Sequence, residues 1–245
     1  MKVTVIGEIC EDIFVYGESK RLSPEVPVPV FVPKRSSANK GMAGNVVQNL
    51  LAINPSCDVI GFHQSRSIKK TRYVHDKTNH MFLRVDEGEV VENFVMTEHI
   101  LKRIIESDIV IISDYDKGYL DKHDIRSISS NSKLCILDSK KVLDTYTIKS
   151  VRFVKLNETE FQNNKFDDSD ISKIIITRGI DGTDYMGNNY PSPKPIQTMD
   201  VSGAGDTFTA AFAIKYFETK ETKQSIIYAN EMASIVVSKR GVATP

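Results

Sequence analysis

Short, almost uninterrupted apolar runs recur along this chain of 245 residues and constrain its fold more than any other feature. They cover 3–7, 108–113, 134–138, 153–156 and 174–177. Most of them lack the alternation of polar and apolar residues that is typical of a half-exposed strand. We therefore expect strands covered on both faces, as in a parallel sheet between layers of helices.

Helical patterns fall between and after these runs. The strongest lies in 97–106, where apolar residues recur at helical spacing. Other helical patterns cover 44–53, 121–129, 203–217 and 222–239. Alternating strands and helices predict an α/β fold with a doubly wound, mostly parallel sheet flanked by helices, in a single domain over 1–245.

Two stretches do not fit these layers. Valine alternates with proline in 26–33, which indicates an edge strand or extended arm, because proline cannot donate a ladder hydrogen bond. Two extended runs, 72–75 and 81–85, flank a polar turn and predict a hairpin. We expect a small β lid, with segments at about 13–34 and 71–86, that covers a site or contacts another subunit. An ordinary extension of the sheet is the alternative.

Composition excludes several classes of protein. The chain has 32 basic and 32 acidic residues, so its net charge does not indicate a partner among nucleic acids or anionic membranes. No apolar run approaches the roughly 20 residues of a membrane helix, and the N-terminus resembles a strand more than a signal peptide. The three cysteines lie far apart, as expected of buried free thiols rather than a zinc site. We expect a cytoplasmic protein.

The segment Asp-Val-Ser-Gly-Ala-Gly-Asp at 200–206 carries the clearest chemistry. It precedes a helical pattern, and its glycines, Gly203 and Gly205, would let backbone N–H groups approach an anion at the helix start. A carboxylate beside such an anion site, Asp206, could act as a general base. The segment matches neither the P-loop nor the dinucleotide fingerprint. A structural turn with a capping aspartate remains open.

Residues 200–213 resemble, position by position, the C-terminal signature of the ribokinase-like carbohydrate kinases, also called the phosphofructokinase-B family. Gly-Met-Ala-Gly-Asn at 41–45 is similar to the glycine-rich sugar signature of that family, with Met42 where a second glycine is common. Asn-Glu-Thr-Glu at 157–160 resembles its N-x-x-E motif. The match implies a kinase that uses ATP and Mg²⁺ and phosphorylates a sugar or sugar phosphate.

The resemblance also implies roles for individual residues. It implies Asp206 as the base, and Gly203, Ala204 and Gly205 as donors to the transferring phosphoryl group. Sugar contacts fall on Asp12, Gly41, Asn45, Arg72 and Arg84. Nucleotide contacts fall on Thr177, Arg178, Gly179, Gly182, Asn230 and Gly241. Asn157 and Glu160 would hold Mg²⁺ through water.

One branch of the family is the most similar. Residues 21–30 and 113–118 resemble segments of the heptose-7-phosphate kinases, which implies transfer to the anomeric hydroxyl of D-glycero-D-manno-heptose 7-phosphate. Arg72 and Arg84 could grip the substrate phosphate, or they could be ordinary surface charges of an exposed sheet. The extended arm at 26–33 and the hairpin at 71–85 expose strand edges that another subunit could cover, so we expect a homodimer through the β lid.

The chain departs from the branch at three places. Glu8 replaces a usual aspartate, Ser139 replaces a usual proline, and only nine residues separate Gly61 from Thr71, where relatives fit a further strand and helix. The shortened region borders the expected sugar pocket. Another sugar or a nucleoside as acceptor, and a non-catalytic sugar- or nucleotide-binding regulator, therefore remain alternatives.

Overall fold

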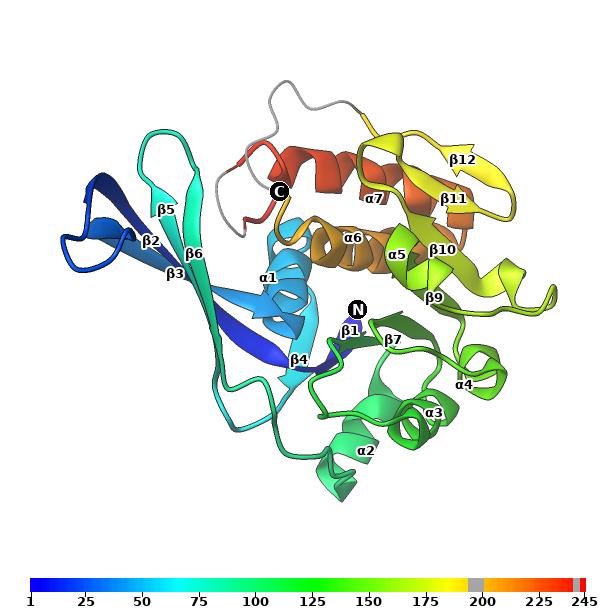
Figure 1. The fold of residues 1–245 in the computed structure, drawn as a ribbon. Coiled ribbons are helices and arrows are strands. Elements are labelled where there is room, and N and C mark those ends of the chain that lie inside the picture. The colour runs from blue at the N-terminus through cyan, green and yellow to red at the C-terminus, as the bar shows by residue number, and fades with distance from the viewer. Residues whose placement is uncertain (194–200, 240–242) are drawn as a thin grey trace.

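The computed structural model describes residues 1–193, 201–239 and 243–245. In this part of the chain an α/β body holds one large sheet between helices, and a second sheet projects from one side of the body (Figure 1). The predicted fold class is confirmed. Three features expected from the sequence lie outside the described residues, namely an extended segment at 195–199, Asp200 and Gly241.

The large sheet has eight strands in the described residues. From edge to edge they are β12 (Asn188–Tyr190), β11 (Thr183–Tyr185), β10 (Ile174–Thr177), β9 (Phe153–Asn157), β8 (Cys135–Ser139), β7 (Ile109–Asp114), β1 (Lys2–Gly7) and β4 (Asp58–Phe62). Neighbours from β10 to β4 are parallel, and only β11 and β12 pair antiparallel. The carboxyl ends of β7, β8 and β9 therefore meet at one edge, where ligands of such sheets bind.

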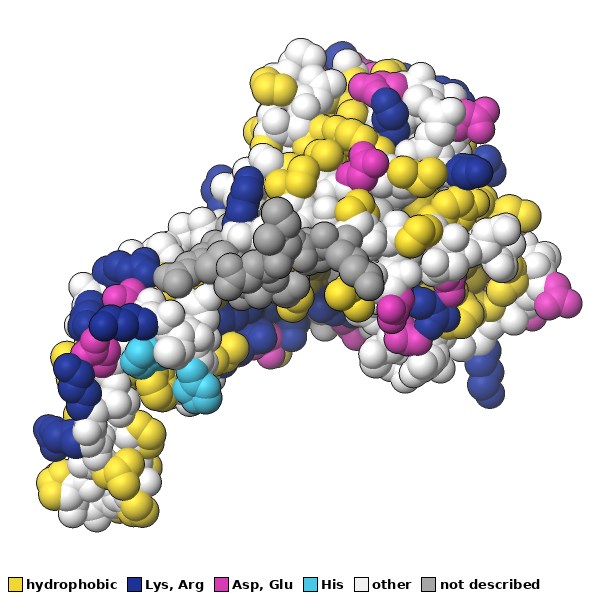
Figure 2. All heavy atoms as spheres, turned by 90° about the horizontal axis from the view of Figure 1, so that it is seen from above, with side chains coloured by type: hydrophobic (Ala, Val, Ile, Leu, Met, Phe, Trp, Pro, Cys, Tyr) yellow, Lys and Arg dark blue, Asp and Glu magenta, His cyan; other side chains and the backbone are white. Residues whose placement is uncertain are grey.

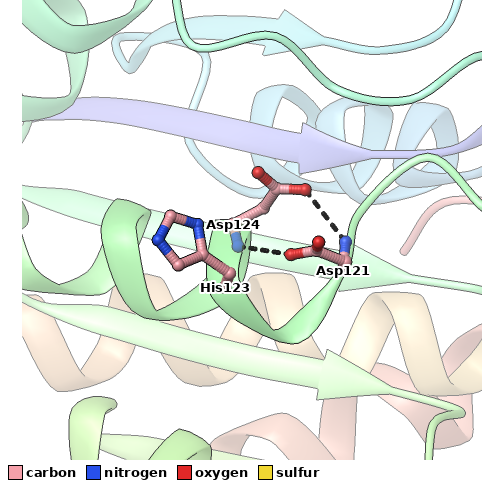
Figure 3. Close-up of side chains that lie close together, drawn as sticks. All are labelled: Asp121, His123 and Asp124. Atoms are coloured by element: carbon pink, nitrogen blue, oxygen red, sulfur yellow. Dashed lines mark hydrogen bonds between the residues drawn. The ribbon is translucent and has the colours of Figure 1, made fainter.

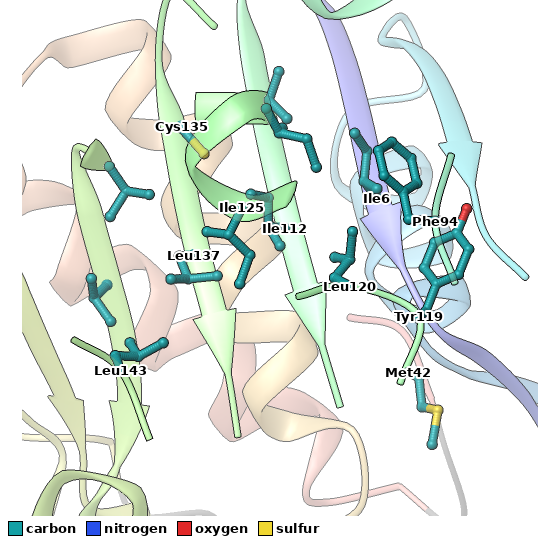
Figure 4. Packing of buried hydrophobic residues seen from close by; sticks show 14 of the residues in the cluster. Ile6, Met42, Phe94, Ile112, Tyr119, Leu120, Ile125, Cys135, Leu137 and Leu143 are labelled. Atoms are coloured by element: carbon teal, nitrogen blue, oxygen red, sulfur yellow. The ribbon is translucent and has the colours of Figure 1, made fainter. Parts of the chain in front are cut away.

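Helices cover both faces of this sheet. They are α1 (Ala43–Ile53), α2 (Glu98–Glu106), α3 (Lys122–Ser130), α4 (Thr145–Ser150), α5 (Glu158–Gln162), α6 (Ala204–Thr219) and α7 (Thr222–Val236), with short 3₁₀ turns at Ile171–Lys173 and Gly179–Asp181. Successive residues of β7 show why two layers are needed: Ile111 packs in the core with α1, α6 and α7, whereas Ile112 packs in the core with α2, α3 and α4. Figure 4 shows the second core, with Ile125 of α3 over Ile112 and Leu137.

The projecting sheet, called the lid below, is built from four long strands. These are β2 (Ile9–Leu22), β3 (Pro29–Met42), β5 (Ile68–His75) and β6 (Met81–Glu87), in the order β3-β2-β5-β6. The predicted hairpin is confirmed as the antiparallel pair β5–β6. The proline-rich strand does lie at an edge, where a missing N–H is tolerated, although it begins at Pro29 and extends to Met42. The lid is therefore longer than the predicted segments.

Several short helices and strands were not predicted from the sequence. Strands β11 and β12 have three residues each and are largely polar, and α5 has five residues. Such windows are too short to show a period, so only pairing with neighbours defines them. The large sheet ends at β4, from which the chain passes directly to lid strand β5, as the short stretch after Gly61 suggested. No helix in the described ranges has the length and apolar character needed to cross a membrane.

Candidate active site

Asp206 lies in the first turn of α6 and is only 5% exposed. Gly203 precedes the helix with a φ of 82°, a left-handed conformation that glycine adopts without strain. The carboxylate accepts two hydrogen bonds, from Asn45 Nδ2 to Oδ2 at 2.9 Å and from the Tyr115 hydroxyl to Oδ1 at 2.7 Å. Burial nevertheless raises the pKa of Asp206 to about 6. A carboxylate with this pKa is ionised at neutral pH and can still take up a proton.

A buried polar chain fixes the orientation of Asn45. Asn49 lies one turn later on α1 and donates to Asn45 Oδ1 at 3.0 Å, so the amide nitrogen of Asn45 faces Asp206. Thr207 donates to Asn49 Oδ1 at 2.8 Å. Asn45, Asn49 and Thr207 are all fully buried, so these bonds are strong constraints. Asn49 was not predicted, although its spacing of four residues from Asn45 on a mostly apolar helix was a usable signal.

A cavity of about 460 Å³ opens beside Asp206 at the carboxyl edge of the large sheet. Most of the predicted catalytic, nucleotide and metal residues line it, namely Asn157, Glu160, Thr177, Gly179, Gly182, Gly203, Ala204, Gly205, Asp206 and Asn230. The lining also includes side chains that were not predicted, among them Tyr115, Asp138, Lys140 and Lys155. These four side chains lie on β8 or β9 or directly after β7 or β8, so the parallel sheet brings them together.

Lys155 forms a buried ion pair on the cavity wall. Its ammonium lies 3.0 and 3.2 Å from the two carboxylate oxygens of Asp138, which also accepts a hydrogen bond from Thr209 at 2.9 Å. Burial opposes the charge of Lys155, but the carboxylates of Asp138 and Glu160 outweigh it and raise the pKa of Lys155. A Cβ atom on Gly205 would lie 3.0 Å from this ammonium. Glycine therefore lets the start of α6 approach a permanent cation, which favours an anion at this point.

The backbone of the α6 start agrees in part with the predicted anion hole. The N–H of Ala204 donates to the carbonyl of Val201 at 3.3 Å, a long hydrogen bond. The first regular helical bond runs from the N–H of Thr207 to the carbonyl of Gly203 at 3.0 Å. The amide of Gly205 belongs to the first turn, where helices lack internal acceptors. Gly205, together with Lys155, is thus the best-placed anion donor.

Asn157 and Glu160 form a capping box at the start of α5. Asn157 Oδ1 accepts the N–H of Glu160, and Glu160 Oε2 accepts the N–H of Asn157, both at 2.8 Å. The start of a helix is therefore enough to explain why these two side chains lie together. Both side chains also line the cavity, and their oxygen atoms are of the kind that Mg²⁺ prefers.

In the turn after β10, one predicted nucleotide residue, Gly182, lines the cavity and another, Arg178, does not. Gly182 has a φ of 91°, and a Cβ there would lie 2.2 Å from the carbonyl of Tyr190, so this position requires glycine. Arg178 is held by Asp184, at 2.6 Å from Nε, and by Glu158, and it is not among the residues that line the cavity. The structure therefore gives no support to a nucleotide contact by Arg178, because neighbouring carboxylates hold its guanidinium elsewhere.

Asn230 shapes the far wall of the cavity. It accepts a hydrogen bond from Thr183 at 2.7 Å and donates to the carbonyl of Tyr190 at 2.9 Å, so its amide joins α7 to the β11–β12 hairpin. Asn230 is 4% exposed. Its observed role is to hold the wall in place.

The predicted sugar residues gather where the lid meets the body. Arg72 of β5 forms an ion pair with Asp12 of β2, and both side chains are about nine-tenths buried. The thiol of Cys10 donates to Asp12 Oδ2 at 3.6 Å, and a Cβ on Gly41 would lie 2.0 Å from the same oxygen. Arg84 lies opposite Arg72 on β6 in a two-bond ion pair with Asp86. Asp12, Gly41 and Arg72 thus form one cluster, with Arg84 at its outer side.

One group of potential metal ligands lies elsewhere. Asp121, His123 and Asp124 come together at the start of α3 (Figure 3). The two carboxylates accept each other's backbone N–H at 3.0 and 2.7 Å as a capping box. Their closeness is explained by this helix start; Asp121 is exposed and Asp124 is half-buried.

Comparison with known proteins agrees with this geometry. Residues 130–245, which hold α6 and most of the cavity lining, match the model of the pfkB family carbohydrate kinases. This part of the chain is therefore similar to the carbohydrate kinases of this family. The bifunctional protein HldE of Bradyrhizobium diazoefficiens is 30% identical over 98% of the chain, and that of Helicobacter pylori strain J99 is 29% identical over 99%. The chain spans only 60% and 64% of these two relatives.

The first of these alignments extends over 298 positions. Since this chain has 245 residues, at least 53 positions of that relative (298 less 245) have no counterpart here. Among solved structures, ribokinase from Arabidopsis thaliana, complexed with ribose and ATP, has a TM-score of 0.70 at 16% identity and covers 98% of this chain and 93% of its own. Ribokinase from Thermotoga maritima gives 0.72 at 15%, over 98% and 94%. At these identities the likeness establishes the ribokinase-like fold.

Proposed function

We propose that this chain is an ATP-dependent carbohydrate kinase of the pfkB family in which Asp206 is the general base. The observation that carries the proposal is the position of this buried carboxylate. It lies between the cavity that holds the predicted nucleotide residues and the sugar cluster at the base of the lid. Cys10, which contacts Asp12, is close enough to Asp206 that the charge of Asp206 affects the pKa of its thiol. A base in this place can reach a hydroxyl bound on one side and a phosphate bound on the other.

In the proposed reaction Asp206 takes the proton of a sugar hydroxyl. The hydroxyl oxygen bonds to the γ-phosphorus of ATP while the bond from that phosphorus to the leaving oxygen of ADP breaks. Lys155 and the N–H of Gly205 stabilise the negative charge of the phosphoryl group. Mg²⁺ fits the oxygen donors of Asn157 and Glu160, which would hold it through water, and it supplies neutralising charge to the phosphates.

The proposed acceptor is the anomeric hydroxyl of D-glycero-D-manno-heptose 7-phosphate. Support comes from the similarity of 21–30 and 113–118 to heptose-7-phosphate kinases and from cationic side chains near the sugar cluster. Figure 2 shows Lys and Arg side chains gathered on the lid. Lys70 is nine-tenths buried and faces Tyr115, and burial lowers its pKa. Lys70 and Arg84 are therefore candidate ligands of a substrate phosphate, and the cytoplasm, where ATP is abundant, is the proposed location.

Asp206→Asn tests the proposal. The variant should lose at least about a hundredfold in turnover, since a positioned base contributes about 10²–10⁴. Its fold should be no less stable, because the pKa of Asp206 lies above its unfolded value near 3.9. Folding therefore favours the protonated form, and ionisation near pH 6 costs up to about 3 kcal/mol that Asn avoids.

The assay is ATP-dependent phosphorylation of heptose 7-phosphate, ribose, fructose 6-phosphate and adenosine, with urea unfolding alongside. Wild-type activity should fall as the pH drops through about 6. Full turnover by Asp206→Asn would remove Asp206 from its role, and tight binding of ATP and sugar without turnover on any acceptor would indicate a regulator. Activity on a neutral sugar alone would refute the phosphorylated acceptor.

We also propose that the lid contacts a second copy of the chain. It exposes a set of apolar side chains to solvent, namely Leu22, Val26, Val28, Val32, Met81 and Leu83, and its outer strands have edges that another chain can cover. Sedimentation at micromolar concentration should give the mass of a dimer, and Leu83→Lys should lower it to that of a monomer. A monomeric wild type would refute this contact.

A further inference from the structure

Tyr115 contacts the candidate base, although the resemblance of 113–118 to other kinases assigned no role to this side chain. Its hydroxyl donates to Asp206 Oδ1 at 2.7 Å, and its ring lines the cavity. Two ammonium groups lie over the ring, that of Lys140 at 4.4 Å and that of Lys70 at 5.7 Å from its centroid. These cations attract the π-electrons of the ring and so make the hydroxyl a better donor.

The segment that carries Tyr115 is clamped on both sides. Glu8 is fully buried, and its carboxylate accepts the backbone N–H groups of Tyr115 at 2.8 Å, Lys117 at 3.0 Å and Tyr119 at 3.3 Å. On the other side, Asp114 accepts hydrogen bonds from Lys141 and Ser139, at 2.7 and 2.6 Å. These hydrogen bonds to the loop and to the residue before it hold the Tyr115 hydroxyl within hydrogen-bonding distance of Asp206.

Some of the surroundings of Asp206 disfavour its ionised form, so a hydrogen-bond donor to its carboxylate matters. Burial disfavours its ionised form, and the carboxylate of Asp138 acts in the same direction. The opposing influences come from Asn45 on α1, Lys155 on β9 and Tyr115 itself, while the thiol of Cys10 faces Asp206 from the lid. Burial and the nearby Asp206 raise the pKa of Tyr115 well above its ordinary value, so this hydroxyl keeps its proton.

We propose that Tyr115 is a positioning residue for the general base: its hydroxyl holds the Asp206 carboxylate ionised and in one orientation, ready for the acceptor hydroxyl. This inference rests on the proposed function. The reason is that a hydrogen bond donated to a carboxylate stabilises the charged form and disfavours the protonated one. Tyr115 donates throughout the reaction, and the substrate proton goes to Asp206.

The first test measures the ionisation of Asp206 directly. Protein labelled with ¹³C-aspartate is titrated by NMR, and Asp206→Asn identifies the resonance. Tyr115→Phe removes one O–H group and should raise the pKa of Asp206 from about 6 by about one unit, since a hydrogen bond to a charge is worth about 1.5–3 kcal/mol and one unit is 1.36 kcal/mol. Tyr119→Phe is the matched control, because Tyr119 lies in the same loop as Tyr115 but its ring packs against Phe94. An unchanged titration in Tyr115→Phe would overturn the proposal.

The second test follows kcat/KM against pH. In Tyr115→Phe the deficit should be at least about fivefold near pH 6 and should shrink as the pH rises past 8, with little change in KM for ATP. A deficit of equal size at every pH would show a structural role and contradict the inference. If the wild type transfers no phosphoryl group to any acceptor, the proposed function fails, whereas the NMR titration still decides the role of Tyr115.

Discussion

The ion pair between Lys155 and Asp138 should respond to substitution in a strongly non-additive way. The two side chains are 9% and 10% exposed, and their charged atoms are 3.0 Å apart. At an effective dielectric constant of 20, unit charges at this distance attract by about 5–6 kcal/mol. Removal of each charge from water costs several kcal/mol. The intact pair therefore stabilises the fold little, but removal of one partner leaves a buried charge without compensation.

Lys155→Met and Asp138→Asn should each lower the free energy of unfolding by about 3 kcal/mol. The double variant should lose clearly less than the sum, with a coupling of at least about 2 kcal/mol. Urea unfolding at pH 7.5, followed by circular dichroism, measures all three. Lys2→Met is the control, because the pair of Lys2 with Glu106 is 3.4 Å long and nearly half exposed, and its loss should cost less than about 0.5 kcal/mol.

The second substitution, Asp138→Asn, should restore stability to Lys155→Met without restoring nucleotide binding. Lys155→Met removes the ammonium beside Gly205, so ATP should bind about tenfold more weakly by calorimetry, as expected for the loss of one charge-assisted contact. The double variant should keep this weak binding although its stability partly returns. Additive effects within about 0.5 kcal/mol, or ATP affinity equal to that of the wild type in Lys155→Met, would refute the reasoning.

Two further predictions concern the backbone. Met42 has a φ of 57° and a ψ of −135°, a region that favours glycine, and its side chain is buried. Met42→Gly should therefore be more stable than Met42→Ala by about 1 kcal/mol in urea unfolding, and the opposite order would contradict the observed backbone strain. Gly205→Ala should lower kcat without lowering the melting temperature, because its Cβ would press on the Lys155 ammonium while alanine favours the helix by up to about 1 kcal/mol. An unchanged kcat would contradict the proposal that Gly205 is part of the anion site.

Much of the local structure could be predicted from residues close in sequence. The uninterrupted apolar run of β7 indicates a strand covered on both faces, and the polar turn before Met81 indicates the β5–β6 hairpin. The segment that ends at Asp206 places a carboxylate in the first turn of a helix. The glycine signature even marks a special position at Met42, where the structure shows a positive φ. Each of these features depends on neighbours within a few residues.

Other features depend on distant parts of the chain. Arg178 stands in a segment that was predicted to contact the nucleotide, yet Glu158 and Asp184 hold its guanidinium and it is not among the residues that line the cavity. Asn230 and Thr183 bond each other from different elements and shape a wall. No local pattern distinguishes a side chain that will find such a partner from one that will face a ligand.

The sequence by itself determined that Asp206 stands at the start of a helix, beside glycines suited to an anion. Only the tertiary structure decided that it is buried with a pKa near 6, bonded to Tyr115 and close to Lys155. The physical reason is that parallel strands bring their carboxyl ends to one edge, so groups many residues apart become neighbours there. Burial and pairing set the charge of a carboxylate, and both depend on those neighbours rather than on the local sequence.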